Sequence, residues 1–98
     1  MQFIVIAHDY KDGLQRRLDM RAKHIELGNN LVLNDKALYG VALLNENGQM
    51  NGSVYIMDFR SREELDEWLK NEPYVIAKVW EKIEVIPCQV GPSFINKL

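Results

Sequence analysis

Arg17, Arg21 and His24 are residues whose types and spacing fit a chemical role. On a helix they would lie along one edge of the same face. Guanidinium groups bind anions, and a histidine can exchange a proton near neutral pH. The spacing therefore fits a site for a small acid, and it equally fits an ordinary solvated helix edge.

Two carboxylates and a hydroxyl elsewhere in the chain could complete such a site. Glu72 precedes Pro73, where its carboxylate can either cap the turn that follows or lie beside His24 and fix the imidazole tautomer. Asp9 follows the first apolar run and could supply a carboxylate to the same site. Ser53 could donate a hydrogen bond to a ligand or satisfy the backbone at a strand end. The residues alone leave these alternatives open.

Several common catalytic and cofactor-binding motifs are missing from the sequence. It contains no Walker loop, no G-x-G-x-x-G, no H-E-x-x-H and no G-x-S-x-G. The single cysteine, Cys88, cannot form an internal disulfide, and a packed thiol is its expected state. We therefore expect neither a metal nor a cofactor.

The composition predicts one folded domain over residues 1–98. Hydrophobic residues make up 47% of the 98 residues and charged residues 27%, which suits a packed core. A net charge of −2 gives no positive field for nucleic acid. The longest apolar run, residues 3–7, is far shorter than the roughly 20 residues of a membrane span. We expect a cytoplasmic protein that binds neither nucleic acid nor membrane.

The hydrophobic pattern predicts strands, helices and one hairpin. The first helix should bury a stripe of Leu14, Leu18, Ala22 and Ile25 and end at residues 28–30. The second begins at a capping box of Ser61 and Glu64. The predicted elements are strand 3–7, with His8 and Asp9 in the loop after it, helix 13–27, extended segments 31–33 and 38–44, hairpin loop 45–52, strand 53–59, helix 62–70, a helical turn from Pro73 with Val75, Ile76 and Val79 inward, strand 82–86, and a tail that includes Phe94 and Ile95.

This order is β-α-β-β-α-β, the ferredoxin-like α+β arrangement of a four-stranded antiparallel sheet with both helices on one face. Both alternating sets of strand residues are apolar, so the uncovered face would expose a large apolar surface. A second copy of the chain is the simplest cover. We therefore predict a homodimer whose two sheets face each other as a barrel, and the sequence leaves open whether dimers assemble further.

Three short motifs together resemble the YCII-related (YciI-like) family over nearly the whole chain. Each fragment is weak alone, and their order and spacing are fairly specific. The motifs are Arg21-Ala22-Lys23-His24, Gly52-Ser53, and the segment from Glu72-Pro73-Tyr74-Val75 to Ile86-Pro87.

The resemblance implies a dimeric α+β barrel and a cleft that holds a His-carboxylate dyad, here His24 and Glu72. Members of the family are linked by similarity to muconolactone isomerase-like and dehydrochlorinase-like chemistry on small ring compounds. The chain differs from the family pattern in having Glu72 where Asp is usual, and Ala77-Lys78 where Ala-Gly is usual.

Two functional hypotheses follow. In the first, the chain is an enzyme that acts on a small organic acid or lactone without a metal. His24 transfers a proton, Glu72 orients it, Arg21 and Arg17 bind negative charge, and Ser53 and Asp9 contact the substrate. In the second, a non-catalytic module binds a small ligand or a protein in the same cleft. An RNA-binding sheet is disfavoured by the net charge and by the predicted dimer.

Overall fold

The computed structural model describes residues 1–94 and confirms the predicted α+β fold. Each predicted strand and helix is present, with boundaries that differ in places. The elements are β1 (Gln2–Asp9), α1 (Leu14–Leu33), β2 (Ala37–Leu44), β3 (Met50–Asp58), α2 (Arg62–Asn71), α3 (Pro73–Ile76) and β4 (Trp80–Cys88). Of the predicted C-terminal tail, Ile95 lies outside the described residues.

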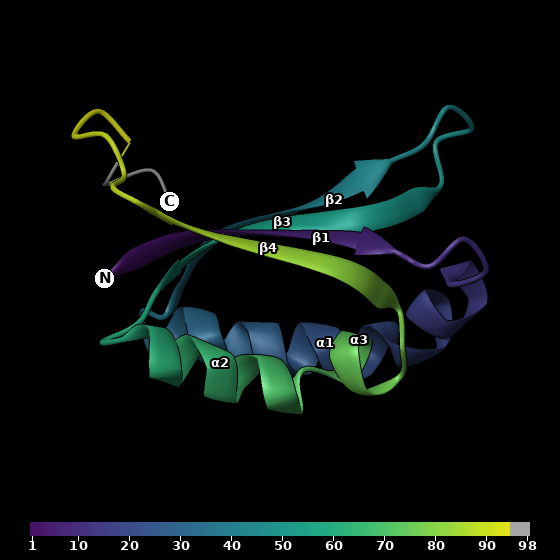
Figure 1. Ribbon diagram of the computed structural model, residues 1–98, viewed down its shortest axis with the longest axis horizontal. Coiled ribbons are helices and arrows are strands. Elements are labelled where there is room, and N and C mark those ends of the chain that lie inside the picture. Colours follow the sequence, from purple (N-terminus) through teal and green to yellow (C-terminus); the bar gives the residue numbers. More distant parts are fainter. Residues whose placement is uncertain (95–98) are drawn as a thin grey trace.

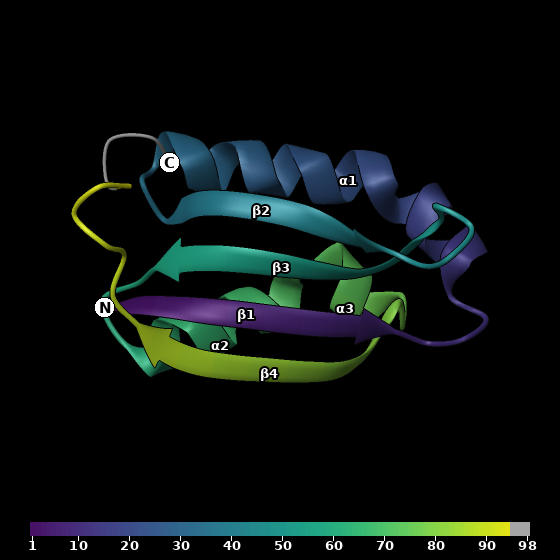
Figure 2. The same cartoon turned by 90° about the horizontal axis from the view of Figure 1, so that it is seen from above.

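The four strands form one antiparallel sheet in the order β2-β3-β1-β4. All of the helices within residues 1–94 lie on one side of this sheet, and the other side, here called the bare face, carries no helix (Figure 1). On the bare face, Ile4 and Ile56 line a hollow together with Val90, Gly91 and Phe94 of the C-terminal segment. From above, α1 follows the β2 edge, while α2 and α3 lie under β3, β1 and β4 (Figure 2). This is the ferredoxin-like arrangement expected from the element order.

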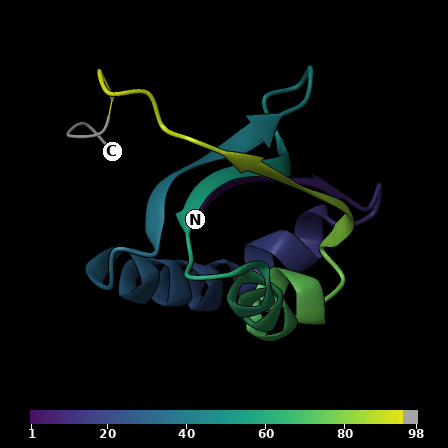
Figure 3. The ribbon, with the colours of Figure 1, turned by 60° about the vertical axis from the view of Figure 1, so that its left-hand side comes forward.

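The hydrophobic core lies between the sheet and the helices. Alternate residues of β1 point to the helix side, so Phe3, Val5 and Ala7 are buried. Met57 of β3 is paired with Phe3 and is buried on the same side. After a 60° turn of the ribbon, the curved sheet is seen to arch over the helices (Figure 3). The remaining buried apolar residues are Phe59, Leu65, Trp68, Tyr74, Val79 and Trp80.

Helix α1 continues through the residues that were expected to end it. It runs to Leu33, so the predicted stop at 28–30 and the predicted extended segment 31–33 are both wrong. Leu27 and Leu31 pack one turn apart against the core, and this contact outweighs the cost of about 1 kcal/mol for a glycine inside a helix. The helix ends at Asn34, followed by Asp35 at a φ of 58°.

The buried side of α1 is also not the predicted apolar stripe. Leu18 and Ile25 are 47% and 42% exposed, whereas Arg17 is only 2% exposed. Arg17 and His24 point into the space between the helices and the sheet, where polar partners lie. Asp9 and Ser53 of the sheet contact the guanidinium, and Glu72, between α2 and α3, contacts the imidazole. Hydrophobic periodicity predicts a buried helix face from the positions of apolar side chains alone. It therefore does not detect a face that is buried through paired polar side chains.

Other boundaries also differ from the prediction. Strand β3 begins at Met50 instead of residue 53, so the hairpin loop is shorter than the expected 45–52. His8 and Asp9 belong to β1 instead of the following loop, because Asp9 still pairs with Trp80 after a register shift. That pairing also starts β4 at Trp80, before the expected residue 82. In α3, Ile76 is 65% exposed although it was expected inward, while Val79 is fully buried. None of the helices within residues 1–94 is both long and apolar enough to cross a membrane.

Candidate active site

His24 stands at the centre of a line of three hydrogen-bonded side chains. Its Nδ1 lies 2.6 Å from Oε1 of Glu72, and its Nε2 lies 2.8 Å from the hydroxyl of Tyr55. A neutral imidazole that carries its proton on Nδ1 donates to the carboxylate and accepts from the phenol. The chain Glu72-His24-Tyr55 is therefore consistent in donors and acceptors with one tautomer.

The break between α2 and α3 aims the Glu72 carboxylate inward. A residue before proline is pushed to extended backbone, and Glu72 has φ −68° and ψ 124° ahead of Pro73. Its Oε1 also accepts a hydrogen bond from the Tyr74 backbone at 3.2 Å, which caps α3. Capping and contact with His24 were posed as alternatives, and the same oxygen makes both. Glu72 is only 1% exposed.

Tyr74 fixes the plane of the imidazole. Its ring lies parallel to His24, with centroids 4.0 Å apart and an interplanar angle of 9°. The Arg17 guanidinium lies 4.8 Å from the centre of the same phenol ring. Burial raises the pKa of Tyr74 above the ordinary value. With Glu72 at one nitrogen and Tyr74 along one face, the imidazole has little freedom to turn.

Arg17 is held inside the protein by Asp9. Nε and Nη2 of Arg17 lie 2.7 and 3.0 Å from the two carboxylate oxygens of Asp9, and both side chains are 3% exposed. Nη2 also donates to the hydroxyl of Ser53 at 2.8 Å. Burial alone would lower the pKa of Arg17, but the hydrogen bonds and charge of Asp9 raise it overall. The Arg17 charge is therefore already balanced within the protein.

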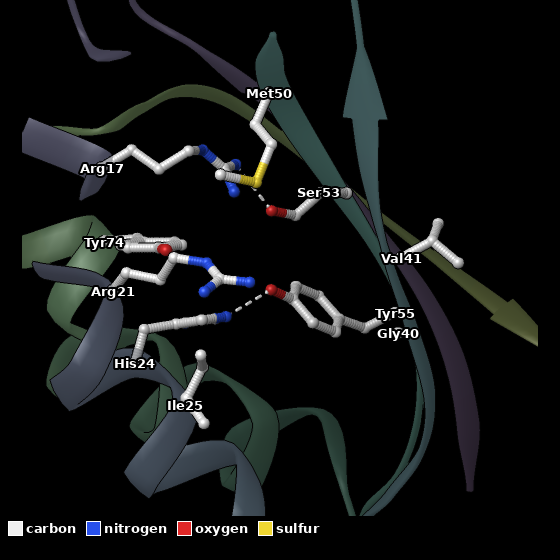
Figure 4. A pocket seen from close by; sticks show the side chains of 11 residues that line it. Arg17, Arg21, His24, Ile25, Gly40, Val41, Met50, Ser53, Tyr55 and Tyr74 are labelled. Carbon is white, nitrogen blue, oxygen red and sulfur yellow. Dashed lines mark hydrogen bonds between the residues drawn. The ribbon is translucent and has the colours of Figure 1, made fainter. Parts of the chain in front are cut away.

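Arg21 is the cation that remains available in the pocket. It lines a hollow of about 200 Å³ together with Arg17, His24, Ser53 and Tyr55. In the described part of the chain, no hydrogen bond or ion pair joins its guanidinium to another side chain. Figure 4 shows Arg17, Arg21, His24 and Ile25 extending from α1, with Ser53 and Tyr55 pointing back from β3. The other residues that line the hollow are Ile25, Gly40, Val41, Ala42, Met50 and Tyr74.

Tyr55 is a site residue that the sequence analysis missed. The sequence analysis did not single it out, although it lies two positions after Ser53 in β3 and so shares its face. A Cβ on the opposite Gly40 would lie 2.8 Å from the Tyr55 ring, so glycine leaves the room that this ring occupies. Burial raises the pKa of the Tyr55 hydroxyl well above its ordinary value. The hydroxyl therefore remains a hydrogen-bond donor at neutral pH.

All six predicted site residues lie in one region. Arg17, Arg21, His24 and Ser53 line the hollow, while Glu72 lies behind His24 and Asp9 behind Arg17. The arrangement offers a base with an orienting carboxylate, and a nearby cation that has no side-chain partner among residues 1–94. Within residues 1–94, no group of three His, Cys, Asp or Glu side chains is placed to hold a metal ion.

Comparison with known proteins identifies the family. The sequence model of the YCII-related domain matches residues 1–89. The chain belongs to the YCII-related family. It is 32% identical to protein YciI of Escherichia coli over 95 residues, which cover 89% of this chain and 95% of that protein. A protein of Haemophilus influenzae is 27% identical over 93 residues, with the same coverage of both chains.

A solved member of the same fold is an enzyme. The chain superimposes with a TM-score of 0.84 on the 5-chloro-2-hydroxyhydroquinone dehydrochlorinase of Burkholderia phenoliruptrix, in complex with 2,5-dihydroxybenzoquinone. The two are 26% identical, and the match covers 95% of this chain and 98% of the dehydrochlorinase. Protein Atu4242 of Agrobacterium tumefaciens shares the fold alone, with a TM-score of 0.50 and 19% identity over 94% of this chain and 98% of that one.

Proposed function

We propose that this YCII-related protein is an enzyme that removes a proton from a small organic acid or lactone, in an isomerisation or an elimination. The observation that carries the proposal is the His24-Glu72 pair at 2.6 Å beside a hollow that also holds Arg21. The structural neighbour supports it, because that protein is a dehydrochlorinase with a small oxygenated ring bound.

His24 is the proposed general base. In one route, the Tyr55 hydroxyl moves away from Nε2, and Nε2 accepts the substrate proton directly. In the other route, Nε2 accepts the hydroxyl proton of Tyr55 while the phenol oxygen accepts the proton of the substrate. The Glu72 carboxylate holds Nδ1–H and stabilises the imidazolium that forms, as an orienting acid does in other His-carboxylate pairs. The broken bond leaves its electron pair on the substrate. In an elimination that pair forms a double bond, the leaving group departs with its own bonding pair, and the imidazolium passes its proton to water. In an isomerisation the imidazolium returns the proton to a different atom of the substrate.

Arg17 and Arg21 have different proposed roles because their partners differ. Arg21 has no partner within the described residues and lines the hollow, so it receives the negative charge of the substrate. Arg17 is neutralised by Asp9, and it serves chiefly to hold Ser53 and the floor of the site. The Ser53 hydroxyl remains able to accept or donate one further hydrogen bond to a ligand.

The test is turnover of 5-chloro-2-hydroxyhydroquinone and of a panel of single-ring hydroxylated acids and unsaturated lactones. Chloride release and ultraviolet absorbance follow the reaction. Because a positioned general base contributes about 10²- to 10⁴-fold, we expect His24→Gln to lower kcat by at least about 100-fold. The thermal midpoint and the oligomeric state should stay close to those of the unmodified protein.

The second histidine supplies a matched control. His8 is exposed on β1 and does not line the hollow, so His8→Gln should leave turnover intact. Turnover that survives His24→Gln, or that falls equally in both variants, would remove His24 from the proposed role.

One observation favours a second candidate, a module that binds a small ligand without changing it. Nε2 of His24, the nitrogen that a base would use, is already bonded to Tyr55. In that case ligands would bind the unmodified protein and no member of the panel would be turned over. Ligand binding that persists in both His24→Gln and Glu72→Gln would favour this candidate.

We also propose that a second copy of the chain covers the bare face of the sheet, and that the protein acts in the cytoplasm. Ile4, Ile6, Val54 and Ile56 lie on that face, opposite the helices, as the strand register requires. An apolar surface of this kind is typical of an interface, and a two-fold pairing makes it self-complementary. A cytoplasmic location agrees with a single free cysteine.

A further inference from the structure

A second hollow adjoins the candidate active site along α1. It measures about 230 Å³, and it shares His24, Ile25, Gly40 and Tyr55 with the first hollow. Its other lining residues are Gly28, Asn29, Val32, Ala37 and Tyr39. The two hollows are therefore parts of one groove between α1 and β2, with the His24-Tyr55 bond where they meet.

One stripe of α1 forms the helical wall of this groove. At about 100° per residue, Arg21, Ile25, Gly28 and Val32 fall within about 60° of the helix circumference. The stripe is basic at its first residue and apolar beyond it. Apart from the shared His24, the second hollow is lined by no ionisable group other than the phenols of Tyr39 and Tyr55. The groove therefore has a cationic end and an apolar end.

The apolar end has room that the protein does not fill. Ile25 and Val32 are 42% and 58% exposed although both are aliphatic. A Cβ added at Gly28 would have no atom within 4 Å. A cavity of about 150 Å³ is enough to hold a benzene ring, so the first hollow alone can take a single-ring ligand. The second hollow then offers space for a further group on that ring.

We propose that the groove is a two-part site for an amphipathic organic anion, whose ring and charge lie by Arg21 and whose apolar substituent lies on Ile25, Gly28 and Val32. This inference rests on the proposed function, since it names the substrate class of the same site. The groove is continuous with the His24 hollow, and the Arg21 guanidinium has no side-chain partner in the described part of the chain. Both observations argue for one amphipathic small molecule.

The test is the affinity of the full chain for benzoate, 4-ethylbenzoate and 4-butylbenzoate, followed by amide chemical shifts. Burial of each methylene should tighten Kd by up to about fourfold. Shifts should appear at Arg21 for all three acids and at Gly28 and Val32 for the alkylated ones. Arg21→Met should weaken every member by about tenfold or more, because a charged hydrogen bond is lost.

Gly28→Leu fills the apolar end, and it should abolish the gain from the alkyl chain. Leucine is a better helix former than glycine, so the variant is expected to fold. Ala22→Leu adds the same side chain to an exposed position of α1 outside the groove, and it should keep the full gain.

A Kd that is independent of chain length, a gain that persists in Gly28→Leu, or no binding by any of the three acids would overturn the two-part site. The chemistry is judged separately by turnover. If the chain-length gain is present while His24→Gln keeps turnover, the proposed function fails and the two-part site stands. If the gain is absent while turnover requires His24, the two-part site fails and the proposed function stands.

Discussion

At the scale of single residues, His24 lies between a carboxylate that accepts and a hydroxyl that can donate, and this pair of partners favours one neutral tautomer. Glu72 can only accept from Nδ1, and Tyr55 can donate to Nε2. We therefore expect nitrogen-15 spectra of the neutral imidazole to show a proton on Nδ1. Glu72→Ala should allow the other tautomer, whereas Tyr55→Phe should leave the Nδ1 proton in place.

His8 provides the internal reference for this measurement, since it is exposed and has no hydrogen-bond partner among the described residues. Its two tautomers should be averaged in every variant. A proton found on Nε2 of His24 in the unmodified protein would mean that Tyr55 accepts at that position, and the proposed route through Nε2 would then be wrong.

Residue types and spacing supplied the candidate site residues, and the family resemblance paired His24 with Glu72. What the sequence did not predict has physical causes. Helical spacing placed His24 and the two arginines together, and Pro73 marked the break that aims Glu72. Spacing could not distinguish Arg17 from Arg21, because the distinction lies in Asp9, which contacts Arg17 from a strand. Tyr55 was missed because an aromatic residue in an apolar strand gives no sign of a hydrogen bond until the facing helix is placed.

At the scale of elements, the turn between α3 and β4 carries backbone strain at Lys78. Lys78 has a φ of 58°, a region that side chains with a Cβ disfavour by about 1–2 kcal/mol. Its carbonyl accepts hydrogen bonds from Nε and Nη2 of Arg16 at 3.1 and 2.9 Å. The usual glycine of the resembled motif would suit this conformation, because glycine adopts positive φ readily.

We therefore expect Lys78→Gly to raise the free energy of unfolding by about 1 kcal/mol, after the greater chain entropy of glycine is counted. Urea denaturation measures the change. Lys78→Ala removes the same charge and long side chain but keeps the Cβ, so it should bring no such gain. Equal effects of the two substitutions would show that backbone strain at residue 78 is not the cause.

The elements were predictable in kind and order, and less so in length. Alternation and β-branched runs located every strand, and the capping box located the start of α2, where Ser61 accepts from the Glu64 backbone. The predicted end of α1 was wrong, because the glycine and asparagines at 28–30 locally disfavour a helix, whereas Leu27 and Leu31 pack against the core in the helical conformation. Packing against residues that are distant in sequence sets the end of α1, and a local stretch of sequence does not reveal that packing.

At the scale of the whole molecule, the helices within residues 1–94 bury one face of the sheet and leave the bare face, which we propose a second copy covers. Ile4 lies on the bare face in an interior strand, paired with Ile56 on one side and Ile86 on the other. A stable interface buries roughly 800 Å² on each partner, and a charge at its centre would lose water without gaining a counter-charge. Ile4→Lys should therefore weaken the proposed homodimer strongly.

Sedimentation velocity at micromolar concentration measures this prediction. We expect the unmodified protein to sediment as a dimer and Ile4→Lys as a folded monomer, because Ile4 contributes little to the helix-side core. Ile76→Lys makes the same substitution at an exposed position of α3 on the helix side, so it should remain dimeric. A monomeric unmodified protein, or a dimer that Ile76→Lys disrupts and Ile4→Lys does not, would place the interface elsewhere and leave the apolar sheet face without the proposed partner.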